Sequence, residues 1–181
     1  MDCSEVMFDG QSLTLLVRPE READFDAVRR VVEEAFARAE HTDGDEHNLV
    51  DRLRRSEEYI PSLSLVAEVN GEIVGYVMFS RIYVGNAEAV ALAPLAVLPA
   101  YQNKGIGRAL ICDGHRRAMK MGYGCSVVLG SPDYYSKCGF LPASQFGITA
   151  PFEIPSQFYM VYPMTRSIPG GRVRYSAAFG L

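Results

Sequence analysis

Short apolar runs alternate with polar turns along most of the chain, and their spacing predicts both strands and helices. Alternating or continuous apolar positions predict strands at residues 12–17, 63–69, 72–80, 88–97, 126–129, 158–162 and 173–175. Helical spacing predicts helices at residues 20–38, 49–53 and 107–121, and a short one around 134–137. This mixed order of strands and helices indicates an α/β domain built on a mixed sheet.

One turn and one proline refine the expected sheet. Asn70-Gly71 is the favoured two-residue hairpin turn, because both central positions need positive φ. Pro94 lies inside the strand at 88–97 and donates no ladder hydrogen bond, so pairing must fail locally on one side. A bulge is favoured over an edge strand, because the helix that follows suggests an interior position. Bulges often sit beside active sites.

The helix at 107–121 carries two packing expectations. Its buried stripe is expected to consist of Leu110, Gly114, Ala118 and Met121. Gly122 is a suitable terminator after this helix, and His115 is expected on its solvated face.

Composition limits the possible classes of protein. The 181 residues suit one domain over residues 1–181, with a core at about 12–165 and a C-terminal strand within 166–181. The hydrophobic share of 48% predicts a real core. A net charge of −4 without a basic block argues against a nucleic-acid partner. No apolar run of spanning length and no leader segment is visible, so we expect a cytoplasmic protein without a membrane partner.

The cysteines do not indicate a metal site or a disulfide framework. They are widely spaced, without a C-x-x-C pair or a histidine cluster, at Cys3, Cys112, Cys125 and Cys138. We therefore expect no metal, and we interpret Cys138 as a small core residue rather than a nucleophile.

Residues 92–110 hold the clearest chemical signal in the chain. An apolar strand runs into a polar turn with Gln102, Gly105 and Gly107, and a helix follows at once. The first N–H groups of a helix lack intrahelical partners, and the macrodipole adds partial positive charge there. Glycines have no Cβ, so an anion can approach the backbone closely. These features together predict a phosphate cradle.

The spacing of the cradle narrows the choice of ligand. A Walker loop needs G-x-x-x-x-G-K-[ST], which is absent, and a dinucleotide fingerprint needs a third small residue where Leu110 stands. The residues present read Q-x-x-G-x-G, with a strand before them and a helix after them. Lys104 and Arg108 flank the motif, and their position favours phosphate contact over a purely solubilising role.

This motif resembles the acetyl-CoA motif of the GCN5-related N-acetyltransferase (GNAT) superfamily, and the resemblance covers almost the whole chain. Residues 135–140, Y-S-K-C-G-F, are similar to the signature after the family's fifth strand. Residues 129–132 and 171–179 resemble the YhbS-like branch of predicted N-acetyltransferases. The resemblance implies an α/β (α+β) GNAT fold. Its mixed, mostly antiparallel sheet of about seven strands would splay between the fourth and fifth strands, with about four helices.

The resemblance also implies a cofactor site. In the family, the pantetheine arm lies in the wedge between the splayed strands and bonds to exposed backbone like an added strand. Carried over, the pantetheine contacts fall on Leu95, Ala96 and Val97. The pyrophosphate would be held by Gln102, Asn103, Lys104, Gly105, Ile106, Gly107 and Arg108. Ala93 stands where many relatives place glycine, and it is small enough for binding to be kept.

The implied reaction moves an acetyl group from acetyl-CoA directly to a primary amine. Tyr135 matches the family's general acid, because a phenol with a pKa of about 10 stays protonated at neutral pH. Packing at a helix start is the alternative role. Glu88 opens the fourth strand, where several relatives place a base or a base-bound water, and a solvated strand-end carboxylate is the alternative. Glu40, His41 and His47 fall in the region of the acceptor wall, but are expected as exposed residues.

We therefore expect an acetyl-CoA-dependent N-acetyltransferase that uses a small-molecule amine. The slightly acidic chain gives mild support to a cationic acceptor. Many relatives dimerise, so a homodimer is a further expectation. A non-catalytic acyl-CoA-binding sensor or regulatory module is the alternative function.

Overall fold

The structure is a computed structural model that describes residues 3–8, 11–37 and 44–181, with side chains from residue 14 onward. Its helices are α1 (Phe25–Phe36), α2 (Glu46–Arg54), α3 (Ile106–Lys120) and α4 (Pro132–Tyr135). Its strands are β1 (Cys3–Phe8), β2 (Gln11–Pro19), β3 (Ser64–Val69), β4 (Glu72–Val84), β5 (Ala87–Val97), β6 (Cys125–Leu129), β7 (Leu141–Pro142), β8 (Ile148–Thr149), β9 (Tyr159–Pro163) and β10 (Gly171–Arg174).

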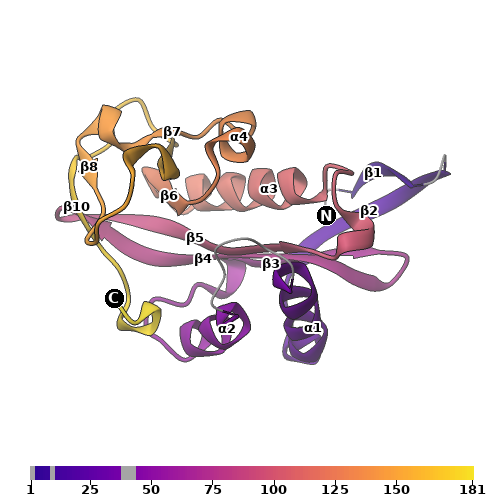
Figure 1. Ribbon diagram of the computed structural model, residues 1–181. Coiled ribbons are helices and arrows are strands. Elements are labelled where there is room, and N and C mark those ends of the chain that lie inside the picture. Colours follow the sequence, from indigo (N-terminus) through magenta and orange to yellow (C-terminus); the bar gives the residue numbers. More distant parts are fainter. Residues whose placement is uncertain (1–2, 9–10, 38–43) are drawn as a thin grey trace.

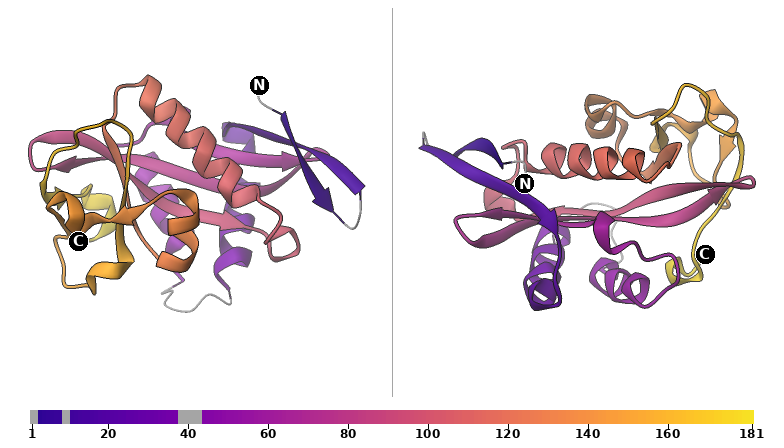
Figure 2. Two further views of the ribbon diagram at one scale, coloured as in Figure 1. Left: turned by 90° about the horizontal axis from the view of Figure 1, so that it is seen from above. Right: turned by 180° about the vertical axis from the view of Figure 1, so that it is seen from behind.

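The described strands form one mixed sheet between two layers of helices. Its order is β1-β2-β3-β4-β5-β6-β9-β7, and β10 pairs with β4 and with β8. Helices α1 and α2 cover one face, while α3 and α4 lie over the other (Figure 1; Figure 2). Most neighbouring strands are antiparallel, whereas β5 and β6 are parallel. The predicted mixed and mostly antiparallel sheet is confirmed.

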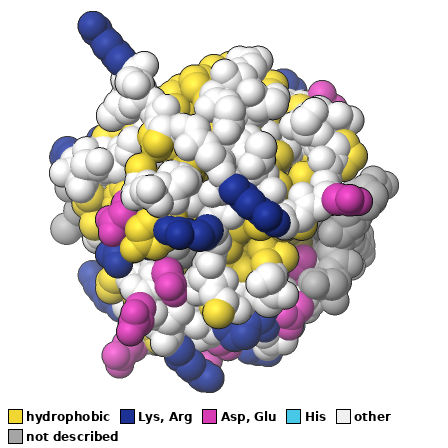
Figure 3. Space-filling model, turned by 90° about the vertical axis from the view of Figure 1, so that its left-hand side faces the viewer, with side chains coloured by type: hydrophobic (Ala, Val, Ile, Leu, Met, Phe, Trp, Pro, Cys, Tyr) yellow, Lys and Arg dark blue, Asp and Glu magenta, His cyan; other side chains and the backbone are white. Residues whose placement is uncertain are grey.

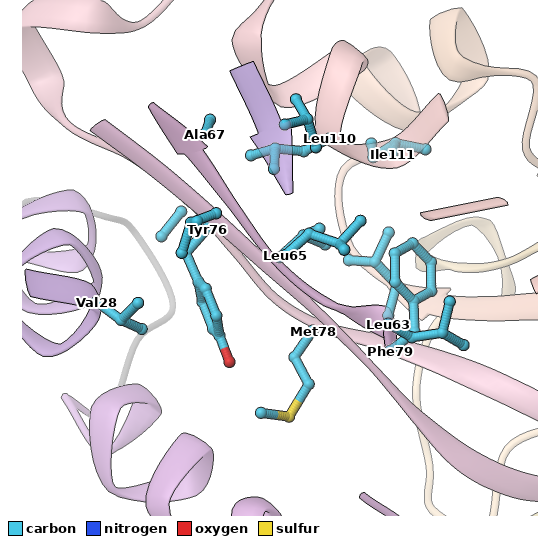
Figure 4. Close-up of a cluster of buried hydrophobic side chains, with 14 of the residues drawn as sticks. Val28, Leu63, Leu65, Ala67, Tyr76, Met78, Phe79, Leu110 and Ile111 are labelled. Carbon is cyan, nitrogen blue, oxygen red and sulfur yellow. The ribbon is translucent and has the colours of Figure 1, made fainter. Parts of the chain in front are cut away.

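Strand β4 is the centre of the core because both of its faces are covered. Residues 73–80 are all buried. Tyr76 and Met78 point to the side of Val28 on α1, whereas Phe79 lies on the side of α3 (Figure 4). Helix α3 comes so close to the sheet that a Cβ on Gly114 would overlap the Phe79 ring. Burial on both faces explains why this strand is an almost continuous apolar run.

The turn and the bulge predicted for this part of the sheet are both confirmed. Asn70 and Gly71, which join β3 to β4, have φ of 51° and 83°. On β5, Leu92 pairs with Phe79 and Leu95 pairs with Val77, so two residues of β5 stand opposite a single residue of β4. The proline is accommodated by this bulge in an interior strand, because β5 has a neighbour on each side.

A buried carboxylate fastens α2 to the sheet. Glu20 is 1% exposed, and its Oε2 accepts a hydrogen bond of 2.6 Å from Nη2 of Arg54, which is 7% exposed. Its Oε1 accepts hydrogen bonds from the hydroxyls of Tyr59 and Ser64. A buried ion pair needs such additional hydrogen bonds to offset desolvation.

Two packing expectations for α3 are wrong. His115 is only 3% exposed, and its ring stacks on Tyr162 at 4.1 Å. Burial lowers the pKa of His115 to about 3, so the imidazole is neutral at physiological pH. Met121 is 49% exposed, because the helix ends before it and its side chain leaves the buried stripe.

Candidate active site

Strands β5 and β6 separate along their length, and this separation forms the central feature of the site. Their parallel pairing is limited to Val90 with Ser126 and Ala91 with Val127. Beyond Ala91, β5 continues to Val97 with pairing only to β4. The edge of residues 92–97 that faces β6 therefore offers backbone N–H and C=O groups to a ligand, as an exposed strand edge does.

The turn after β5 leads to the start of α3 at the end of this gap. Gly105 precedes the helix with φ of +83°, a conformation that suits glycine, and no side chain caps the helix. Within the described chain, no backbone carbonyl accepts from the N–H groups of Ile106, Gly107 or Arg108. The start of α3 thus presents unpaired donors and the positive end of the helix dipole.

The side chains of this turn fix its position and add charge. The Gln102 side-chain amide donates a 3.0 Å hydrogen bond to the carbonyl oxygen of Val97, which ties the turn to the end of β5. Asn103 has φ of 60°, and its side chain is exposed. Lys104 is half-buried and Arg108 is exposed beside the helix start. The cradle therefore combines unpaired backbone donors with two nearby cationic residues.

Gly107 lies where three elements meet. A Cβ on Gly107 would overlap the hydroxyl of Tyr134 on α4, and would lie 3.7 Å from Cδ2 of Leu95 on β5. Tyr134 is 40% exposed, and burial of its hydroxyl raises its pKa to about 12. No motif in the sequence predicted this contact of Tyr134 with the cradle. Only the folded chain brings α4 against the start of α3.

Tyr135 lies at the other side of the gap, next to the end of β6. Its ring packs so closely on Gly130 that a Cβ there would overlap it. The ring also contacts Tyr134 and Phe140 edge-on, with centroids 5.1 and 5.3 Å away. Desolvation raises the pKa of Tyr135 well above that of a free phenol, so the hydroxyl keeps its proton.

A cavity of about 270 Å³ opens where β5 and β6 separate. Residues 91–93 of β5 and 127–129 of β6 form its floor. The walls come from segments far apart in the chain, with Leu49, Phe152, Tyr175, Phe179 and Leu181. Tyr175 and Phe179 belong to the segment 171–179 that resembles the YhbS-like branch, but no pattern in the sequence places them beside Leu49 and Phe152.

Glu88 does not line this cavity. It lies at the start of β5, three residues before Ala91, the first residue of that strand in the cavity lining. Its side chain is 54% exposed, and Oε1 lies 3.9 Å from Nε of Arg81. Its nearest charged neighbour is thus Arg81 rather than a group of the cavity, and its role as a base stays a prediction.

Of the three residues expected near the acceptor wall, the structure describes only His47. Nε2 of His47 on α2 lies 3.7 Å from Oε1 of Glu33, and the His47 side chain is 18% exposed. Glu40 and His41 lie outside the described residues. Cys138 is half-buried, which partly fits its interpretation as a small core residue.

The described residues at the end of the molecule shown in Figure 3 form no patch of uniform charge. On the end of the molecule near β8 and β10, hydrophobic side chains are mixed with basic and acidic ones (Figure 3). Among the described residues, no three His, Cys, Asp or Glu side chains gather as a metal site. No described helix combines the length and the apolar character needed to cross a membrane.

Comparison with known proteins gives the same picture as the geometry. Residues 25–140 match the family model of the acetyltransferase (GNAT) family. The uncharacterized N-acetyltransferase YjhQ of Escherichia coli K12 is 36% identical over 140 residues, which is 75% of each chain. YhbS of the same organism, also an uncharacterized N-acetyltransferase, is 36% identical over 110 residues, so the predicted YhbS-like resemblance is confirmed.

Two solved structures share the fold over nearly the full chain. YhbS from Escherichia coli in complex with CoA has a TM-score of 0.82 and 26% identity, and the match covers 97% of both chains. A GNAT family acetyltransferase from Brucella melitensis in complex with acetyl-CoA has a TM-score of 0.77 and 32% identity, covering 91% of this chain and 97% of that one. By its sequence and by its fold, this chain belongs to the GNAT family of acetyltransferases.

Proposed function

We propose that the protein is an acetyl-CoA-dependent N-acetyltransferase that acts on a primary amine of a small molecule. The main observation behind this proposal is that an unpaired strand edge leads directly to an uncapped helix start. The unpaired edge of β5 ends in a turn whose next helix presents unpaired N–H groups. An extended arm along the edge would place a diphosphate at the helix start, where anions are stabilised.

The residues present fit acetyl-CoA. Leu95 and Val97 direct their backbone groups to the unpaired edge, where they can bind the pantetheine amides, whereas the backbone groups of Ala96 between them face Tyr76 of β4. Residues 102–108 form the turn and the helix start that would hold the diphosphate, and the absence of a side chain at position 107 makes room for the Tyr134 hydroxyl beside them. CoA and acetyl-CoA are bound in the structures of two family members, YhbS and the Brucella enzyme.

Acetyl-CoA supplies an activated acetyl group: the amine nitrogen forms a bond to the acetyl carbon, the carbon–sulfur bond breaks, the amine loses a proton and the sulfur gains one. Tyr135 holds a proton beside the gap, and its raised pKa keeps the hydroxyl available as a donor. The bulge at Pro94 turns local backbone out of its pairing with β4, so an N–H near Leu95 can stabilise negative charge. Glu88 is the proposed general base. Its side chain does not line the cavity, so the proton of the amine would reach it through a water molecule.

A CoA-thiol release assay tests this function. The protein is incubated with acetyl-CoA, with and without primary amines, and free thiol is followed over time. Thiol release that depends on the amine, with a matching acetylated product, supports the enzyme. Binding of CoA by calorimetry without amine-dependent release would favour the second candidate, a non-catalytic acyl-CoA sensor. The absence of an acidic side chain among the described cavity residues is the observation that favours the sensor.

A further inference from the structure

The walls of the cavity beside the gap are apolar on every described side. Leu49 comes from α2, Phe152 from the segment after β8, and Tyr175 and Phe179 from the segment after β10. The floor is formed by alanine, leucine and valine residues of β5 and β6. Pockets that bind small molecules are mostly apolar, with a few polar groups that fix orientation. In this cavity, the polar groups are the backbone N–H and C=O groups on the edge of β5 that is not paired with β6.

The hydroxyl of Tyr175, the tyrosine in the wall, already has a hydrogen-bond partner within the protein. The hydroxyls of Tyr175 and Tyr159 are 2.9 Å apart and form a hydrogen bond. The ring of Tyr175 lies edge-on to Phe179, with centroids 5.0 Å apart, and stacks with Phe152 at 6.3 Å. Because the hydroxyl is already paired, the ring faces supply the contact surface. An aromatic ligand prefers such offset or edge-on neighbours.

The size of the cavity sets an upper limit on the acceptor. Its volume is about 270 Å³. An apolar protein cavity of about 150 Å³ accommodates benzene. The cavity next to the gap therefore has room for one ring and a short carbon arm, whose end reaches the floor of β5.

The lack of charged side chains in the walls favours an acceptor whose only ionisable group is the reacting amine. No acidic or basic side chain of the described residues lines the cavity. Burial in apolar surroundings lowers the pKa of an amine, so the neutral and nucleophilic form is favoured without a carboxylate in contact. A carboxylate or a second ammonium on the acceptor would lose its hydration without gaining a partner there.

From these features we infer that the acceptor is a primary amine on an apolar body of about one aromatic ring, such as an arylalkylamine. This inference rests on the proposed function and names the substrate class of the same site. It does not draw on the mild expectation of a cationic acceptor, because the whole-chain charge does not extend to the lining of the cavity.

The test compares acceptors of similar reactivity at a fixed concentration of acetyl-CoA. We expect kcat/KM for 2-phenylethylamine and hexylamine to exceed that for phenylalanine and spermidine at least tenfold. The neutral isostere 2-phenylethanol is expected to inhibit competitively against the amine. A preference for spermidine or phenylalanine, or no effect of 2-phenylethanol, would overturn the inference while leaving the acetyltransferase activity in place. No transfer to any of these amines would overturn the proposed function as well.

A charge placed in the wall gives a second test. Leu49→Glu is expected to raise KM for 2-phenylethylamine at least tenfold, with kcat less affected and CoA affinity unchanged. The matched control is Leu141→Glu, at an exposed leucine of β7 that does not line the cavity. Equal KM values for the two folded variants would contradict the assigned wall. The inhibition by 2-phenylethanol is measured on the unaltered protein, so it remains decisive if Leu49→Glu does not fold.

Discussion

Replacing Gly107 by Glu and by Gln separates charge from bulk at the cradle. Gly107 lies in the first turn of α3, where a Cβ would overlap the Tyr134 hydroxyl. Both variants share this overlap, and both must displace a side chain that is 40% exposed. Only Gly107→Glu brings a negative charge to the helix start. The difference between the two therefore reports on an anion bound there.

The expected effects on binding and on stability have opposite signs. A carboxylate about 5 Å from a phosphate charge costs about 3 kcal/mol at an effective dielectric constant of about 20. That corresponds to about a hundredfold weaker binding for Gly107→Glu than for Gly107→Gln. An acidic side chain in the first helical turn, in contrast, stabilises the helix by about 0.3–1 kcal/mol. Weaker binding is thus expected without loss of the fold.

Isothermal titration calorimetry with CoA measures the binding, and thermal unfolding measures the fold. The difference between the two variants should shrink at high salt, because screening reduces the repulsion. Gly124→Ala is the control for a glycine replacement elsewhere, because its Cβ would make only an ordinary contact of 3.6 Å with Thr165. Equal CoA affinity for folded Gly107→Glu and Gly107→Gln would refute the reasoning.

Three further predictions concern the acid, the buried ion pair and the buried histidine. Tyr135→Phe should lower kcat about a hundredfold with little change in the Kd for CoA, measured by thiol release and calorimetry; an unchanged kcat would remove Tyr135 as the acid. Glu20→Gln removes the buried partner of Arg54, which keeps only the more exposed Asp51, and should lower the free energy of unfolding by about 2–3 kcal/mol, whereas Glu72→Gln at an exposed pair should change it by less than about 1 kcal/mol; equal denaturation midpoints would contradict this. The pKa of buried His115 is about 3, so the unfolded chain takes up the proton first, and stability falls by about 1.4 kcal/mol per pH unit as the pH drops from about 6.5 towards 3. Urea titrations should show that His115→Phe loses this part of the slope, and an identical slope would count against a neutral buried imidazole.

The strands and the cradle could be predicted because their signals are local. Asn70-Gly71 sets a turn by its backbone preference, and Pro94 forces a break in pairing wherever it stands in a strand. The seven predicted strands are present, and β1, β7 and β8 are the additions. Strands β7 and β8 have two residues each, too few to show an alternating pattern.

The features that could not be predicted depend on contacts between distant segments. The apolar face of α3 is wider than the stripe read from its leucine and alanine positions, because β9 brings Tyr162 over His115. Tyr134 reaches Gly107 only because α4 folds back over α3. The cavity wall combines Leu49 with residues more than a hundred positions later, such as Phe152 and Tyr175.

A crystal structure of the protein with CoA tests the central claim most directly. We expect the diphosphate at the N–H groups of Gly107 and Arg108, and the pantetheine arm along the β5 edge at residues 92–97, which pairs only with β4. A complex with CoA bound at another surface, or with β5 and β6 paired along residues 92–97, would contradict it.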